Sequence, residues 1–211
     1  MAWYMLSQAE ARGEIRPGGT ILEMTTGNTG IAFSMLAAAR GYRFVAVMPE
    51  HMSIERRQMM RAFGAEVVLT PKAEDMPGAV RRYHELREEL APDVWLPNQF
   101  GNPDNIQAHY LYTGTNLARQ LPEPVDFFVA GMGTGGTFIG VSRRLRETFP
   151  RCRMIGVEPA ESAVLQGGPP GLHGIQGIGE GFVPDIIAQC RGEIDGLLSV
   201  TTAEAEEQAR A

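Results

Sequence analysis

A short run of threonine, asparagine and glycine at residues 25–30 has the composition of an anion-binding loop. It stands between an apolar run, residues 20–23, and a helical pattern, residues 31–40. The first N–H groups of a helix lack intrahelical partners, and the helix dipole adds partial positive charge there. The polar side chains of this loop, which suit a carboxylate and a phenolic oxygen, are those of Thr25, Thr26, Asn28 and Thr29. The simpler alternative is that Asn28 only caps an ordinary surface helix.

A second glycine loop, Gly131-Met132-Gly133-Thr134-Gly135-Gly136-Thr137, follows another apolar run and precedes another helical pattern. It satisfies G-x-G-x-x-G, and Glu158 comes about twenty residues after the loop, as in dinucleotide-binding sites. The hydroxyls of Thr134 and Thr137 are better suited to the several oxygens of a terminal phosphate. We therefore favour a monophosphate site, while a dinucleotide site and a purely structural turn stay open.

Apolar runs and helical patterns alternate along the chain and predict the elements that position these loops. A first helix ends at Gly13, and the later helices are expected at residues 31–40, 54–63, 78–90, 106–121, 138–148, 185–190 and from 201 onward. Strands are expected at residues 20–23, 44–48, 66–69, 94–96, 125–130, 154–158 and 196–200. This alternation predicts an α/β fold with parallel sheets, whose ligands bind at the carboxyl ends of the strands.

A cluster of proline, asparagine and glycine at residues 97–105 is too long for a simple turn. We expect it to divide the chain into two lobes, residues 1–104 and 105–211. The glycine-rich stretch at residues 159–184 has no sustained periodicity and is expected to be irregular. The chain begins and stops inside helical patterns, so we expect both ends to be truncated.

The composition excludes several classes of function. With 211 residues, 44% hydrophobic and 21% charged, the chain is an ordinary globular one. A net charge of −6 with no basic tract argues against nucleic acid as a partner. No apolar run reaches membrane-spanning length and no basic leader precedes the first residues, so we expect no membrane association and a cytoplasmic location. Two cysteines and four scattered histidines match no ligand spacing, which predicts buried thiols and no metal site.

Three stretches occur in an order and spacing that resemble the cysteine synthase (O-acetylserine sulfhydrylase) family. They are Glu23-Met24-Thr25-Thr26-Gly27-Asn28-Thr29-Gly30, Asn98-Gln99-Phe100-Gly101-Asn102-Pro103 and Gly133-Thr134-Gly135-Gly136-Thr137. Residues 157–159 and 174–182 are also similar to that family. The resemblance implies a tryptophan-synthase-β-like fold of pyridoxal 5′-phosphate (PLP) enzymes, fold type II. It further implies two parallel-sheet lobes with the cofactor cleft between them, here with the second lobe incomplete, and a homodimer.

The resemblance also implies roles for individual residues. Asn28 would bind the 3′-oxygen of the pyridoxal ring, and Gly177 would line the opposite wall. The 5′-phosphate would be held by Gly133, Thr134, Gly135, Gly136 and Thr137. The α-carboxylate of the substrate would be bound by Thr25, Thr26, Thr29 and Gln99. For Gln99 the alternative is an amide that braces its own loop.

The implied reaction is β-replacement, in which O-acetylserine and sulfide give cysteine and acetate. Such enzymes need a lysine as Schiff-base partner and as the base for the α-proton. This chain holds 18 arginines and one lysine, Lys72, which lies in a polar link beside two acids. We do not expect Lys72 to serve, because reactive lysines need a desolvating pocket. The family's lysine motif is absent, so no catalytic residue is predicted here.

Three features of the sequence bear on which substrate the protein accepts. Met24 and Thr26 replace the family's usual proline and serine, and the bulkier Thr26 bears on which substrate fits. Glu180 disfavours a phosphorylated substrate, because an acid there would repel a dianion. The alternatives are a cystathionine β-synthase-type enzyme and a non-catalytic ligand- or partner-binding protein on the same scaffold.

Overall fold

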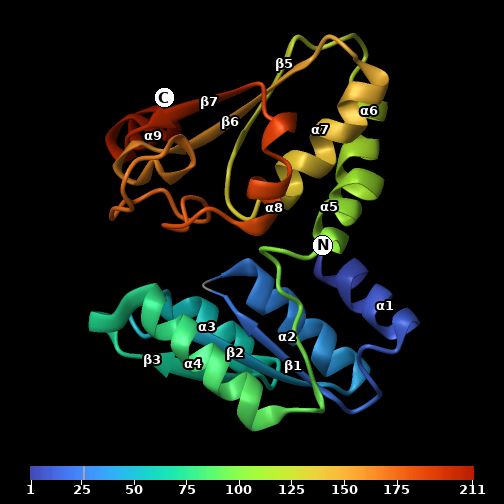
Figure 1. The fold of residues 1–211 in the computed structure, drawn as a ribbon, viewed down its shortest axis with the longest axis vertical. Coiled ribbons are helices and arrows are strands. Elements are labelled where there is room, and N and C mark those ends of the chain that lie inside the picture. Colours follow the sequence, from blue (N-terminus) through green and yellow to red (C-terminus); the bar gives the residue numbers. More distant parts are fainter. Residues whose placement is uncertain (26) are drawn as a thin grey trace. The chain divides into compact units, whose positions relative to one another are not determined.

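The computed structural model describes residues 1–25 and 27–211, with the backbone alone for residue 75. The chain forms two compact units, Met1–Asn98 and Gln99–Ala211 (Figure 1). Each unit contains a parallel sheet flanked by helices, so the predicted α/β fold is confirmed. None of the described helices is both long enough and apolar enough to cross a membrane.

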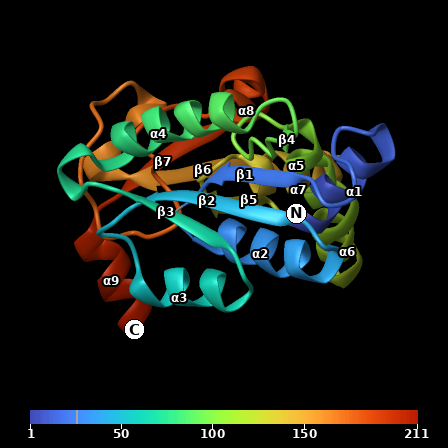
Figure 2. The ribbon, with the colours of Figure 1, turned by 90° about the horizontal axis from the view of Figure 1, so that it is seen from below.

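The first unit is built on a four-stranded parallel sheet with the strand order β3-β2-β1-β4. Its strands are β1 (Thr20–Met24), β2 (Arg43–Pro49), β3 (Glu66–Thr70) and β4 (Val94–Trp95). Helices α2 (Asn28–Arg40) and α3 (Ile54–Ala62) lie on one face and α4 (Asp75–Leu90) on the other, while α1 (Ala2–Arg12) packs against α2 (Figure 2).

Coverage of both faces explains why the two central strands are apolar almost throughout. All residues of β1 after Thr20 and all of β2 after Arg43 are buried. From α2, the ring of Phe33 lies 6.1 Å from that of Phe44 and 5.9 Å from that of Trp95. The core of this unit therefore lies between the sheet and α1 and α2.

The second unit has a three-stranded parallel sheet of β5 (Phe127–Gly131), β6 (Arg153–Pro159) and β7 (Gly196–Val200), in that order. Helix α7 (Gly136–Thr148) packs against β5 and against a helical rod of three segments, α5 (Pro103–Ala108), η2 (His109–Gly114) and α6 (Thr115–Gln120) (Figure 1). Two short helices follow, α8 (Asp185–Gln189) and α9 (Thr202–Arg210).

The helical rod differs from the single helix predicted at residues 106–121. It begins earlier, at Pro103, because the Asn102 side chain caps it by accepting from the Asp104 N–H at 2.9 Å. Its middle segment, η2, is a π-helix, a wider turn that often marks functional sites. A Cβ on Gly114 would lie 2.8 Å from Cβ of Arg144, so this glycine permits close packing on α7.

Two further expectations agree with the structure. The stretch at residues 159–184 holds only the 3₁₀ turns η3 (Ala160–Ser162) and η4 (Val164–Gln166), as its glycine content indicates. Cys152 and Cys190 are free and buried, as predicted.

Candidate functional site

The threonine-asparagine loop of the first unit is shaped by Thr25. This side chain is buried, and its hydroxyl oxygen accepts from the N–H groups of Gly27 at 3.3 Å and Gly30 at 3.1 Å. A Cβ on Gly30 would lie 2.6 Å from Sδ of Met60 and 2.6 Å from Cγ2 of Thr25, so only glycine fits there. Thr25 is therefore the internal brace of the loop, with only its hydroxyl proton left for another acceptor.

Residues 27–30 of this loop form the start of α2. Gly27 is the N-cap and Asn28 the first helical residue, so the alternative that Asn28 caps the helix is wrong. Asn28 is exposed and Thr29 half-buried, while Thr26 lies outside the described residues. A Cβ on Gly27 would lie 3.2 Å from Nη1 of Arg56, a cation at this loop that its sequence position did not reveal.

The glycine loop of the second unit leads from β5 into α7. Gly135 adopts a left-handed conformation with φ +89°, and α7 begins at Gly136. The Thr134 hydroxyl accepts from the N–H of Gly136 at 3.3 Å. Beyond the N–H of Gly136, the loop offers the N–H groups of the first turn of a 13-residue helix, with the hydroxyls of Thr134 and Thr137 beside them.

Gly177 lies against this loop. A Cβ on Gly133 would lie 2.8 Å from the carbonyl oxygen of Gly177, so the two backbones are in close approach. The N–H of Gly179 donates to the carbonyl of Met132 at 3.2 Å and fixes the glycine-rich segment there. The structure therefore brings Gly177 and the loop at residues 133–137 together within one unit.

Asn105, which sequence analysis did not single out, joins Gln99 to the glycine loop. It is 1% exposed, and its Nδ2 donates to the Gln99 carbonyl at 2.8 Å and to Oγ1 of Thr134 at 3.1 Å. Its Oδ1 has no hydrogen-bond partner among the described residues and faces Gly136. Asn105 is therefore the brace of the second loop.

His109 is a further residue that sequence analysis overlooked at the glycine loop. Its Nε2 lies 3.1 Å from Oγ1 of Thr137, and its Nδ1 lies 2.9 Å from Oγ1 of Thr113. Asn105, His109 and Thr113 are spaced by four residues, a helical spacing that places all three on one face of the rod. That spacing is the signal that could have found them.

Glu158 decides against the dinucleotide alternative. The side chain is 1% exposed, and its oxygens accept from the N–H groups of Leu165 at 2.8 Å and Gln166 at 3.1 Å. This carboxylate braces the turn after β6, and its burial keeps it from a ribose hydroxyl. The dinucleotide alternative is wrong, because the carboxylate it requires is used within the fold.

Glu180 lies next to the glycine loop. Its Oε1 is 3.9 Å from where a Cβ on Gly133 would lie. Burial raises the pKa of its carboxyl above the ordinary value, and the charge of His173 opposes that shift only partly. A carboxyl with a raised folded-state pKa binds its proton more tightly when folded. The stability it contributes is present below pH 4.5 and is lost as the pH rises through the folded-state pKa.

We expect Glu180→Gln to become more stable relative to the wild type as the pH rises from 4 to 8, because glutamine carries no charge to desolvate. Urea denaturation of both proteins across this range measures the difference. The exposed Glu123→Gln is the control and should show no comparable trend. A difference in unfolding free energy that is independent of pH would contradict the burial argument.

Two parallel-sheet units, one with a threonine-asparagine loop and one with a phosphate-type glycine loop, define a PLP-dependent enzyme scaffold of fold type II. The family model described as "Pyridoxal-phosphate dependent enzyme" matches residues 1–211. The chain belongs to this family.

Individual relatives agree with this assignment. The chain is 44% identical over 209 residues to a cysteine synthase of a Flavobacterium species, covering 99% of this chain and 67% of that protein. It is 44% identical over 212 residues to a cysteine synthase of Staphylococcus aureus, covering 100% of this chain and 67% of that protein.

Solved structures give the same result. The crystal structure of cysteine synthase from Entamoeba histolytica matches with a TM-score of 0.93 at 42% identity, covering 99% of this chain and 61% of that one. That of the O-acetylserine dependent cystathionine beta-synthase from Helicobacter pylori matches with a TM-score of 0.90 at 41% identity, covering 99% of this chain and 67% of that one. The chain thus spans less than two thirds of the Entamoeba enzyme.

The residues present fit the phosphate of PLP. A Cβ on Gly133 would lie 2.8 Å from the carbonyl oxygen of Gly177, and one on Gly136 would lie 2.1 Å from Oδ1 of Asn105, so both glycines let neighbouring groups pack directly against the loop. Amide and hydroxyl donors surround it, and they match the acceptor oxygens of a phosphate monoester. The family cofactor, PLP, therefore suits the second unit of this chain.

Proposed function

We propose that this protein binds PLP and serves a cysteine-synthase-type β-replacement, in which O-acetylserine and sulfide give cysteine and acetate. The observation that carries the proposal is the 44% identity to cysteine synthases over the whole chain, joined to a glycine loop whose geometry suits a monophosphate. When bound, PLP supplies an electron sink for the amino acid that has lost its α-proton. The residues of this chain bind and orient the reactants.

The glycine loop would hold the 5′-phosphate through the N–H groups at the start of α7 and the hydroxyls of Thr134 and Thr137. Asn28, exposed at the start of α2, would donate its amide N–H to the 3′-oxygen of the ring. Gly177 would form the wall beside the phosphate.

The substrate carboxylate would lie at the start of α2. Thr25 would donate its remaining hydroxyl proton, and Thr26 and Thr29 would add hydroxyls. Gln99 would add an amide, although its backbone carbonyl already serves Asn105. The helix dipole favours an anion at this position.

Lys72 would not be the Schiff-base lysine. It lies exposed in η1 (Lys72–Glu74), and its backbone N–H donates to Oε1 of Glu50 at 2.9 Å. Reactive lysines are desolvated, so we expect PLP to bind this chain reversibly. Borohydride reduction of the PLP-loaded protein followed by peptide mass spectrometry should leave Lys72 unmodified, and a pyridoxyl group on Lys72 would refute this assignment.

The reaction is tested by supplying O-acetylserine and sulfide to the PLP-loaded protein and measuring cysteine by mass spectrometry. Serine with homocysteine, and O-acetylserine with homocysteine, test the cystathionine β-synthase-type alternative. Spectral changes of bound PLP on adding each amino acid report substrate binding even when turnover is absent. Failure of the protein to bind PLP at all would overturn the proposal.

A second candidate is a non-catalytic ligand- or partner-binding protein on the same scaffold. Within residues 1–211 the single lysine, Lys72, is exposed and lies outside both loops, so these residues by themselves favour binding without catalysis. Binding of PLP and amino acid without product formation would support this candidate. We also propose a homodimer, which analytical ultracentrifugation tests directly.

A further inference from the structure

His109 connects the helical rod to the glycine loop through a line of three side chains. The Thr113 hydroxyl lies 2.9 Å from Nδ1 of His109, and Nε2 of the same ring lies 3.1 Å from the Thr137 hydroxyl. All three belong to the second unit. Thr137 is exposed on the first turn of α7, whereas His109 is half-buried behind it.

The rod packs closely on α7 at the position of His109. A Cβ on Gly140 would lie 2.8 Å from Cβ of His109 and 2.4 Å from the carbonyl oxygen of Ile106, so this glycine admits the rod closely against α7. Side chains have few alternatives in such a contact. The imidazole therefore has a fixed position relative to the start of α7.

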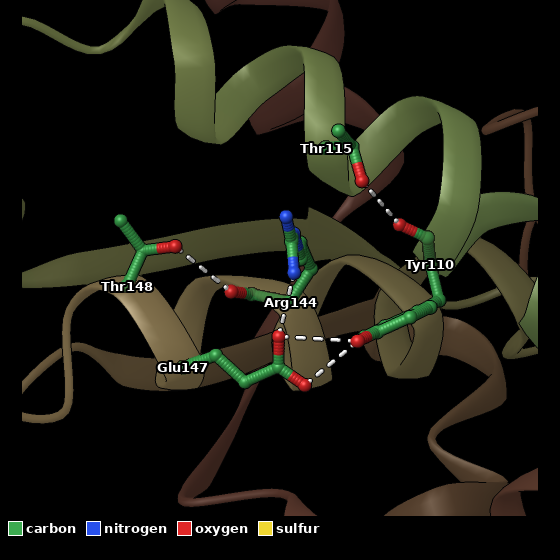
Figure 3. Close-up of polar contacts among 5 residues, drawn as sticks. All are labelled: Tyr110, Thr115, Arg144, Glu147 and Thr148. Carbon is green, nitrogen blue, oxygen red and sulfur yellow. Dashed lines mark hydrogen bonds and ion pairs between the residues drawn. The ribbon is translucent and has the colours of Figure 1, made fainter.

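Tyr110, the residue after His109, belongs to a polar cluster that links the rod to α7 (Figure 3). The Tyr110 hydroxyl donates to Oε1 of Glu147 at 2.8 Å, and Arg144 binds the same carboxylate at 2.8 Å. The Thr115 hydroxyl donates to the Tyr110 carbonyl at 3.1 Å, which satisfies a backbone acceptor in the π-helix. The π-helical segment that carries His109 and Thr113 is thus bonded to the second half of α7.

The imidazole is neutral at physiological pH, because burial lowers the pKa of His109 to about 4. A neutral ring has one donor nitrogen and one acceptor nitrogen. A phosphate oxygen only accepts, so a Thr137 hydroxyl that contacts it must donate its proton to it. The Thr137 oxygen is then free to accept from Nε2–H, and Nδ1 must accept from Thr113.

We propose that His109 is a positioning residue for phosphate binding: through its Nε2–H tautomer, set by Thr113, it directs the hydroxyl proton of Thr137 toward the phosphate of the bound ligand. The inference rests on the proposed function, since it presupposes that the glycine loop holds a monophosphate. Hydrogen bonds run in one direction along the line, from Thr113 through His109 and Thr137 to the phosphate.

The test compares two amides of similar polarity that reach different distances. In His109→Gln the amide reaches the place of Nε2 and can donate to Thr137, whereas in His109→Asn it reaches only toward Thr113. We expect His109→Gln to retain PLP affinity and His109→Asn to lose about tenfold, the size of one hydrogen bond to a charged group. Affinity for pyridoxal, which lacks the phosphate, should be the same in all three proteins. Equal loss of PLP affinity in both variants would indicate a merely structural role and overturn the inference.

Long-range ¹H–¹⁵N NMR of the wild-type protein with PLP determines the tautomer directly, and Nε2–H is expected. Thr113→Val should weaken PLP binding in the same direction as His109→Asn, because it removes the group that fixes the tautomer. An Nδ1–H tautomer in a protein that binds PLP would overturn this inference alone. Failure of the wild-type protein to bind PLP, measured in the same titration, would overturn the proposed function together with it.

Discussion

Gly136→Ala should weaken PLP binding by about tenfold or more and destabilise the second unit. A Cβ at this position would lie 2.1 Å from Oδ1 of Asn105, far inside van der Waals contact. Asn105 is 1% exposed and cannot swing into solvent, so the loop itself must move. Overpacking of this kind costs on the order of 3 kcal/mol. Since every 1.4 kcal/mol weakens an affinity about tenfold, we expect at least about a tenfold loss for PLP, measured by titration alongside urea denaturation.

Gly192→Ala is the matched control for this substitution. A Cβ on Gly192 has no atom within 4 Å, and its φ lies outside the left-handed region. It should change neither the affinity nor the stability measurably. The double variant Gly136→Ala, Asn105→Ala should lose less than the sum of its single changes, because the clash is between these two residues. Strict additivity would show that the clash is not the cause.

Much of the fold could be predicted because its boundaries are set by local chemistry. Gly13 and Gly41 end α1 and α2 with φ of +71° and +73°, a conformation that glycine adopts without strain. Ser53 begins α3 by accepting from the N–H of Arg56, and Thr201 begins α9 with a capping box. Each of these signals depends on residues within one turn of the boundary.

The braces of the two loops could not be predicted in the same way. Thr25 is one of three threonines in its loop, and only the packing of Gly30 against it shows that its oxygen is used internally. The polar cluster at residues 97–105 holds three asparagines, and the one that reaches the glycine loop is decided by how α5 packs on α7. Composition indicates that a site is present, whereas long-range packing decides which side chain supports it and which contacts the ligand.

The same distinction applies to Glu158. Its spacing from the glycine loop agrees with the dinucleotide pattern, but its burial and its two backbone partners make it a brace. The threonine hydroxyls of the loop instead match the donors that a terminal phosphate requires, which agrees with the proposed monophosphate site. Spacing along the chain thus did not reveal that Glu158 is used within the fold.

Asn105→Asp should be the second large effect, although it changes only an amide to a carboxylate of the same shape. The Nδ2 donor is replaced by an acceptor that faces the carbonyl oxygen of Gln99, which has no proton to give. An unpaired buried charge costs on the order of 3–5 kcal/mol. The charge would also lie beside the loop proposed to hold a phosphate dianion and repel it. We therefore expect a large fall in stability and in PLP affinity at neutral pH, measured by urea denaturation and by titration.

The pH dependence of this variant separates charge from shape. Burial would raise the pKa of the new carboxyl in the folded state, and its protonated form can again donate to the Gln99 carbonyl. The stability deficit of Asn105→Asp should therefore shrink as the pH falls through that pKa and grow as it rises. Asn102→Asp, three residues earlier, is the control, because an aspartate accepts from the Asp104 N–H as well as asparagine does. A stability deficit that is the same at pH 5 and pH 8 would mean that Asn105 acts by packing alone. It would contradict the view that the Nδ2 donor of Asn105 supports the glycine loop.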